Sequence, residues 1–249
     1  MTSNRFFIKQ SQLESSTVII YGEEHHHLSK VARIKPGEKI WLFDEKGTNY
    51  LASVEEIRKD MTKLSILEKK NKDKLRVAIT LAQSLIKSKK MELIIQKSTE
   101  LGVATIIPVI TERSIVNIEG KVEKKIERWK KISCEAAKQS HSLIPAILIP
   151  TLLSRLISER DEEKKILLSE HKGRYLRDLL IRSSASGFQI EEPPASVLIL
   201  IGPEGGWTKE EEVDILNHGF ERVSLGQQIL RAETAAVCSL SIISHFWNL

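Results

Sequence analysis

The architecture of this chain follows from Val197-Leu-Ile-Leu-Ile201 and from Gly202-Pro-Glu-Gly-Gly206 directly after it. The first segment is continuously apolar and rich in β-branched residues, which predicts a strand buried on both faces of a parallel sheet. The second segment contains three glycines and a proline, so its backbone can take positive φ and its amides stay uncovered. Thr208 and Glu211 then form a capping box that begins a helix. In an open α/β sheet, such a loop lies beyond the carboxyl ends of the strands, where ligands bind.

A second loop of the same kind follows. Phe220 to Ser224 predicts a short strand, Leu225 to Leu230 a turn with apolar ends, and Arg231 to Thr234 the start of the last helix. A third polar loop, Glu170 to Gly173, follows a predicted strand over Lys165 to Ser169 and leads into a helix expected from about Arg174. The Ser/Gly/Pro-rich segment from Ser183 to Pro194 is expected to be a connector without regular structure. Plain tight turns are the alternative interpretation of any one of these loops. Loops from neighbouring strands that converge on one place favour a ligand site.

Motifs along almost the whole chain occur in an order typical of one family. They are Arg5-Phe-Phe7, His27-Leu28, Val31-Ala-Arg33, Gln96 to Val103, Thr111-Glu-Arg-Ser114, Leu200 to Gly206, Leu225-Gly226, Ile229-Leu-Arg231 and Glu233-Thr-Ala235. In these motifs the chain resembles the RsmE family of the SPOUT superfamily. Members of that family are S-adenosylmethionine-dependent methyltransferases that act on N3 of a uridine in 16S ribosomal RNA.

Two domains are expected from the pattern and from the resemblance. Short strands separated by turns before residue 70 predict a small β-barrel, with one short helix expected over Glu23 to Ile34. The charge run from Lys69 to Lys74 predicts a linker, and strands that alternate with helices after it predict an α/β sheet. The resemblance implies a PUA-like RNA-binding barrel over residues 1–72. It also implies a SPOUT methyltransferase domain over residues 73–249, with a parallel sheet and a trefoil knot.

The resemblance also assigns roles to individual residues. S-adenosyl-L-methionine is expected between the loops, held by Glu170, Leu200, Ile201, Gly202, Gly205, Gly206, Leu225, Gly226, Ile229, Leu230 and Thr234. Methyl transfer to a ring nitrogen also needs an acceptor for the N3 proton and a donor to the developing oxyanion. Arg231 is expected to stabilise the uracil oxygen or a phosphate, and Glu233 and Glu204 are candidate bases. A structural clamp between Arg231 and one of these glutamates is the alternative.

Charge favours an RNA partner. The chain has a net charge of +5 and a pI near 9.1, and most of the surplus lies in residues 1–74. A basic module suits a polyanion, although a solvated basic surface explains the charge equally well. With the resemblance, the expected partner is 16S rRNA or the assembled small ribosomal subunit. The expected RNA-binding residues are Arg5, Arg33, Lys87, Lys89 and Arg113.

The last helix predicts a homodimer. From Glu233 to Trp247 it is apolar on nearly every face, which requires burial on more than one side. SPOUT enzymes are likewise dimers. No segment reaches the length of a membrane-spanning apolar run and no signal-peptide core is present, so a cytoplasmic protein is expected.

Other classes of chemistry fit the sequence less well. The dinucleotide and P-loop fingerprints are absent. No metal is expected, because Cys134 and Cys238 lack metal-ligand spacing and adjacent residues such as His25 to His27 project from a helix in different directions. The chain departs from the family at Gln227-Gln228, at Ala232 and after Ser140. These departures leave open a catalytically inactive RNA-binding SPOUT homologue that acts in ribosome assembly.

Overall fold

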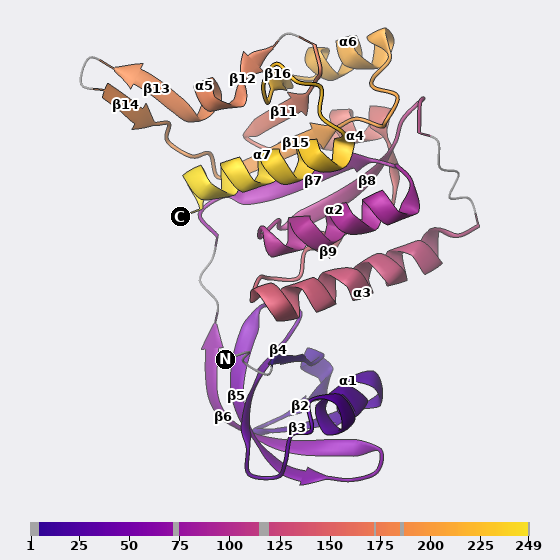
Figure 1. Ribbon diagram of the computed structural model, residues 1–249, viewed down its shortest axis with the longest axis vertical. Helices are drawn as coiled ribbons and strands as arrows, with labels where there is room; N and C mark the ends of the chain where they lie inside the picture. Colours follow the sequence, from indigo (N-terminus) through magenta and orange to yellow (C-terminus); the bar gives the residue numbers. More distant parts are fainter. Residues whose placement is uncertain (1–4, 72–74, 115–119, 172, 185–186, 249) are drawn as a thin grey trace. The chain divides into compact units, whose positions relative to one another are not determined.

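The protein divides into two compact units. The computed structural model describes residues 5–71, 75–114, 120–171, 173–184 and 187–248 (Figure 1). One unit comprises Met1–Lys74 with Ala137–Ile144, and the other comprises Leu75–Ala136 with Pro145–Leu249. The sequence predicted a single cut at residues 72 and 73, which lie outside the described residues. The assignment of Ala137–Ile144 to the first unit was not predicted. Its physical basis is that the Ala137 carbonyl accepts a hydrogen bond from Arg5 Nη1 at 2.7 Å.

The first unit is built on a mixed sheet with the strand order β1-β4-β5-β6-β3-β2. Its strands are β1 Arg5–Phe7, β2 Leu13–Glu14, β3 Thr17–Tyr21, β4 Lys39–Phe43, β5 Thr48–Ile57 and β6 Met61–Asn71. Alternate residues such as Val18, Ile20 and Leu64 are buried in one core. Lys69 to Asn71, predicted as linker, instead continue β6 and pair with β5. Pairing of backbone groups needs no apolar side chains, so the charge run concealed the strand.

A short helical segment connects β3 to β4. It consists of α1 Gly22–His26 and the π-turn η2 His27–Val31, where a single helix over Glu23 to Ile34 was predicted. His25 is buried, with Nδ1 2.8 Å from Thr62 Oγ1 and Nε2 3.2 Å from the Lys59 carbonyl. Its imidazole is therefore used in packing the first unit.

The second unit is an α/β domain around a parallel sheet, as predicted (Figure 1). Its strands are β7 Ala78–Ser84, β8 Thr105–Ile110, β9 Ala146–Ile147, β10 Thr151–Leu152, β11 Lys164–Leu168, β12 Arg174–Tyr175, β15 Ser196–Ile201 and β16 Glu221–Ser224. The strand order is β10-β8-β7-β15-β11-β16-β12, and β9 pairs with β8. β15 lies between β7 and β11, although both precede it in the chain. The trefoil knot stays a prediction.

Helices cover both faces of this sheet. Val197, Ile199 and Ile201 of β15 belong to the core under α2 Ser88–Glu100, α3 Val122–Ser140, α5 Leu176–Leu180 and α7 Ala232–Trp247. Leu198 and Leu200 belong to the core under α4 Leu153–Glu159 and α6 Lys209–Asn217. The central strand is thus buried on both faces, which confirms the first prediction from its sequence.

Two local predictions in the second unit were wrong. The segment from Ser183 to Pro194 was expected to lack regular structure, but β13 Ile181–Ser184 and β14 Gly187–Ile190 pair as an antiparallel hairpin. Phe188 in this hairpin is exposed, so its strands lack the alternation of buried and exposed residues that marks a strand in sequence. The helix expected from about Arg174 begins at Leu176, because Arg174 and Tyr175 pair with β16. Among the described helices, none has the length and apolar content to cross a membrane.

Candidate active site

A pocket lies at the carboxyl ends of three adjacent parallel strands. β11, β15 and β16 are neighbours in the sheet, so the loops that follow them meet at one edge. Residues 168–171, 201–204, 206–207, 223–226 and 228–232 from these strand ends and loops line a cavity of about 230 Å³, together with Lys90 and Ala235. The convergence of the three predicted loops is thereby confirmed.

The glycine-rich loop after β15 has a shape that side chains would obstruct. A Cβ on Gly202 would lie 2.9 Å from the Trp207 indole, closer than real Cβ contacts. Gly206 has a φ of +69°, in the left-handed region that favours glycine. The Trp207 indole donates to the Leu168 carbonyl at 3.4 Å, which ties this loop to the end of β11. The glycines therefore allow a tryptophan to pack against the loop backbone.

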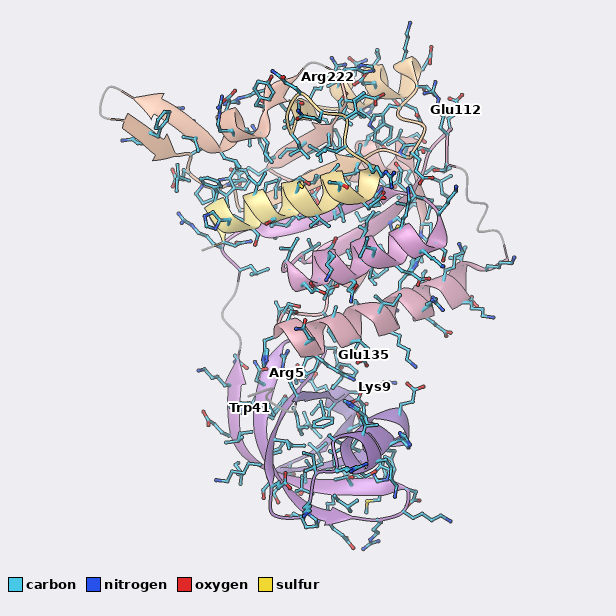
Figure 2. All side chains as sticks on the ribbon, in the orientation of Figure 1. Arg5, Lys9, Trp41, Glu112, Glu135 and Arg222 are labelled. Carbon is cyan, nitrogen blue, oxygen red and sulfur yellow. The ribbon has the colours of Figure 1, made fainter. Side chains whose placement is uncertain are left out.

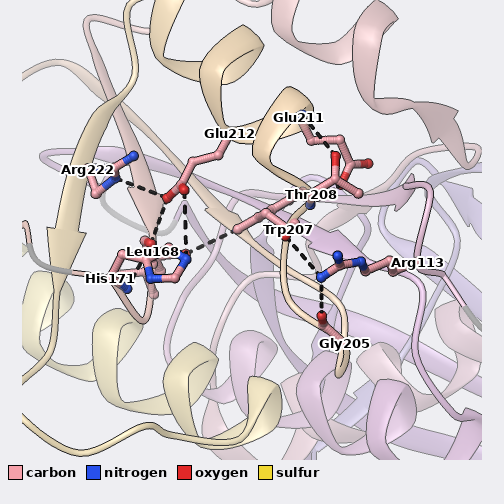
Figure 3. A network of polar contacts seen from close by, with 10 residues as sticks. Arg113, Leu168, His171, Gly205, Trp207, Thr208, Glu211, Glu212 and Arg222 are labelled. Carbon is pink, nitrogen blue, oxygen red and sulfur yellow. Dashed lines mark hydrogen bonds and ion pairs between the residues drawn. The ribbon is translucent and has the colours of Figure 1, made fainter.

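Arg113 holds the same loop from outside the pocket. Its Nη1 donates to the carbonyls of Gly205 at 2.9 Å and Trp207 at 3.2 Å (Figure 3). The neighbouring Glu112 amide donates to Glu211 Oε1 at 2.8 Å. Arg113 was predicted to bind RNA. The structure gives its guanidinium a second role, in fixing the loop backbone.

A buried carboxylate joins the loop after β11 to α6 and β16. Glu212 is 8% exposed, accepts a hydrogen bond from Ser169 Oγ at 2.8 Å and lies 3.0 Å from Arg222 Nε (Figure 3). His171 Nε2 is 4.0 Å away on the pocket side. Sequence reasoning missed this network, because its members come from three separate segments.

Lys90 is a pocket residue that sequence reasoning missed. Its ammonium forms an ion pair with Glu204 of the glycine-rich loop and lies 3.4 Å from Glu233 Oε1 in the first turn of α7. The hydrogen bond from Lys90 holds the pKa of the Glu204 carboxyl below its ordinary value and raises the pKa of Lys90. The pair therefore persists at neutral pH, and it is lost as pH falls through the lowered pKa of Glu204 or rises through the raised pKa of Lys90. The sequence signal that could have identified Lys90 is a lysine in the first turn of a helix that follows the carboxyl end of a predicted strand.

Most predicted cofactor residues line the pocket. They are Glu170, Ile201, Gly202, Gly206, Leu225, Gly226, Ile229 and Leu230, and the candidate catalytic residues Glu204 and Arg231 join them. Leu200 does not, because it is fully buried in the core. Gly205 instead contacts Arg113, and Thr234 is exposed on α7 away from the lining. The clamp considered for Arg231 is not found among the described residues, where Lys90 is the cation that contacts both glutamates.

The predicted RNA-binding residues differ in accessibility. Arg33 is exposed with a φ of +54°, and Lys87 and Lys89 are exposed at the start of α2. Arg5 is only 6% exposed. Its guanidinium donates to Asn49 at 2.9 Å and lies 3.9 Å from the centre of the Phe43 ring, inside the first unit (Figure 2). Its burial leaves Arg5 little free surface, and its RNA contact stays a prediction.

Known proteins match the chain over nearly its full length. Residues 73–244 match a family described as RNA methyltransferase domain, and residues 20–67 match one described as RNA methyltransferase PUA domain. Ribosomal RNA small subunit methyltransferase E of Bacillus subtilis is 33% identical over 97% of this chain and 96% of its own length. The protein of that name from Aquifex aeolicus is 34% identical, over 96% and 99%. The structure of the Neisseria gonorrhoeae protein, bound to S-adenosyl methionine, has a TM-score of 0.86 at 32% identity and 98% coverage of both chains.

Proposed function

Because this chain belongs to the RsmE family of RNA methyltransferases, we propose that it methylates N3 of a uridine in 16S ribosomal RNA with S-adenosyl-L-methionine as methyl donor. One observation carries the proposal. Loops from three adjacent parallel strands form a single pocket, and the residues that the family resemblance assigned to the cofactor make up much of its lining.

The residues of the pocket fit an adenosine-bearing ligand. Leu225, Ile229 and Leu230 offer apolar walls, and Ile229 is 75% exposed, so a flat ligand that covers it gains hydrophobic contact. Gly206 lies against the Glu170 carboxylate, since a Cβ there would be 3.2 Å from Glu170 Oε1. Backbone groups of the loops and this carboxylate would hold the polar parts of the cofactor. When bound, the cofactor supplies an electrophilic methyl group.

The remaining residues of the site would position the target base. Because an in-line transfer depends on how its reactants are held, positioning accounts for much of the rate. Arg231 lines the pocket and is assigned to the uracil oxygen, whose negative charge grows as the N3 proton leaves. Glu233 and Glu204 are the candidate acceptors of that proton. The lowered pKa of Glu204 makes its carboxylate a weaker base than an ordinary glutamate.

The RNA partner is 16S rRNA, alone or in the assembled small subunit. Arg33, Lys87 and Lys89 are exposed cations available to its phosphates. The match of residues 20–67 to an RNA methyltransferase PUA domain supports a role for the first unit in holding RNA. An enzyme of ribosomal RNA works where ribosomes are made, so we place the protein in the cytoplasm. We also propose a homodimer that uses α7.

Binding and product analysis test this function. Titration calorimetry with S-adenosylmethionine should give a single saturable site. Mass mapping of 16S rRNA from a strain that lacks the protein should reveal one uridine without its N3-methyl group, and the wild-type gene should restore it. Donor binding with unchanged rRNA would refute the proposed target. RNA binding without donor binding would favour the inactive assembly factor, an outcome motivated by the departures at Gln227, Gln228 and Ala232.

A further inference from the structure

Lys90 joins two walls of the pocket that are far apart in sequence. It projects from α2, whereas Glu204 lies in the loop after β15 and Glu233 in the first turn of α7. We propose that Lys90 is a positioning residue that sets the spacing between the glycine-rich loop and the start of α7. The inference rests on the proposed function, since it treats the space between these walls as the cofactor site.

The charges explain why a single ammonium can hold both segments. The side chains of Lys90, Glu204 and Glu233 are 31%, 21% and 14% exposed, so solvent screens their attraction less than on an open surface. Without Lys90, two carboxylates that share one neighbour would repel each other.

Glu233 depends most on this contact. Its Oε2 atom is buried and has no hydrogen-bond partner in the part of the chain that the structure describes, so the neighbouring ammonium is its main compensation. A buried carboxylate that loses its cation is costly and moves toward water. Loss of Lys90 would therefore shift the start of α7, where Ala232 and Ala235 line the pocket, and release Glu204 on the opposite wall.

Cofactor binding gives the first test. In the full-length protein, Lys90→Met keeps the aliphatic stem and removes the charge. Because this variant loses two partly exposed ion pairs, its affinity for S-adenosylhomocysteine, measured by calorimetry, should be roughly three- to tenfold lower than that of the wild type. Lys90→Arg should restore it to within about twofold, because charge is kept. Lys97→Met is the matched control, since Lys97 lies on the same helix and pairs with Glu100 outside the pocket. The KM for RNA should not change in Lys90→Met.

A double-mutant cycle tests the partner. Glu204→Gln added to Lys90→Met should cause no further loss of affinity, because the contact is already gone. Additive losses would overturn the inference. So would wild-type cofactor affinity in Lys90→Met together with weaker RNA binding, because Lys90 would then be an RNA contact.

Hydrogen exchange separates this inference from the proposed function, since it needs no ligand. Amides of Gly202, of residues 204–207 and of the first turn of α7 should exchange faster in Lys90→Met than in Lys97→Met. If amide exchange in Lys90→Met equals that in Lys97→Met, the positioning role of Lys90 is overturned, even if the wild-type protein binds the donor. If exchange is faster in Lys90→Met but the wild-type protein binds no donor, the positioning role of Lys90 is supported and the proposed methyltransferase function is refuted. If Lys90→Met does not fold, Glu233→Gln weakens one contact only and gives the same comparison.

Discussion

Single side chains determine what the pocket can hold. Arg231 has an extended backbone at the N-cap of α7 and is one of the residues that line the pocket. Gly202 has the Trp207 indole where a side chain would begin. Arg231 contributes a positive charge, whereas Gly202 leaves room for the Trp207 indole. Each gives a substitution whose effects can be separated.

Replacement of Arg231 should impair catalysis more than binding. Arg231→Ala removes a donor to the developing oxyanion, so kcat should fall by roughly a hundredfold. The Kd for S-adenosylmethionine should stay within about twofold, because backbone groups hold most of the cofactor. Single-turnover methylation and calorimetry measure the two quantities, with Arg231→Lys as the variant that keeps charge. Equal losses of rate and affinity would point to a structural clamp.

Replacement of Gly202 should disturb the loop through Trp207. In Gly202→Ala, the new methyl group meets the indole at 2.9 Å, and the shift of either group should cost about 1–3 kcal/mol of unfolding free energy. Gly205→Ala is the matched control, because its Cβ would lie an ordinary 3.6 Å from Arg113. Urea unfolding of both variants checks this. Equal stability of the two variants would mean that the indole packing is not restrictive.

At the scale of elements, α6 and the loop before it are fixed by polar contacts at the helix start. Glu211 N donates to Thr208 Oγ1 at 3.1 Å, and Thr208 N donates to Glu211 Oε2 at 3.1 Å. Arg113, from the segment after β8, adds hydrogen bonds to two carbonyls of the loop. The capping box therefore fixes the end of the glycine-rich loop at α6, and Arg113 holds its backbone from the segment after β8.

The capping box should contribute measurably to stability. Thr208→Ala leaves an orphan amide at the start of α6 and should lower the unfolding free energy by about 1 kcal/mol. Thr208→Ser keeps the hydroxyl and should recover most of this difference. Urea denaturation with tryptophan fluorescence measures both. A serine variant as unstable as the alanine variant would assign the loss to packing of the threonine methyl group.

Arg113 and Lys89 should affect different ligands. Arg113→Ala should weaken cofactor binding, because the glycine-rich loop loses two hydrogen bonds, and should leave the salt dependence of RNA binding unchanged. Lys89→Ala should do the reverse and reduce the slope of log K against log salt by roughly 0.7–0.9, the effect of one phosphate contact. RNA titrations at several salt concentrations, with calorimetry for the cofactor, test the pair. A lower salt slope in Arg113→Ala would restore its predicted RNA role.

For the whole molecule, α7 is the element that bears on assembly. Its Ala236, Leu240 and Ile243 are buried in the core of the second unit, and α2 and α5 also pack against it. The chain itself thus covers more of α7 than its sequence predicted. Half-buried Val237 and Phe246 leave apolar surface that a second copy could cover.

Light scattering should detect the proposed dimer. At micromolar concentration the mass should be twice the chain mass of 28.3 kDa. Val237→Glu should halve it, because a charge would enter an apolar interface. Thr234→Glu, on the exposed side of α7, tests whether that side belongs to the interface as well. A monomeric wild-type mass at this concentration would contradict the dimer.

Local pattern was enough to predict the buried strand over Val197 to Ile201, the α6 capping box and the convergence of three loops on one edge. Each depends on neighbours in sequence or on the rule that parallel strands end together. The ion pair of Lys90 with Glu204, which lie 114 positions apart, and the burial of Arg5 were not predictable in this way. The strand order places β15 next to β7, which brings the loop after β15 close to Lys90 on the helix that follows β7. Long-range contacts depend on packing in three dimensions, which no periodicity along the chain encodes.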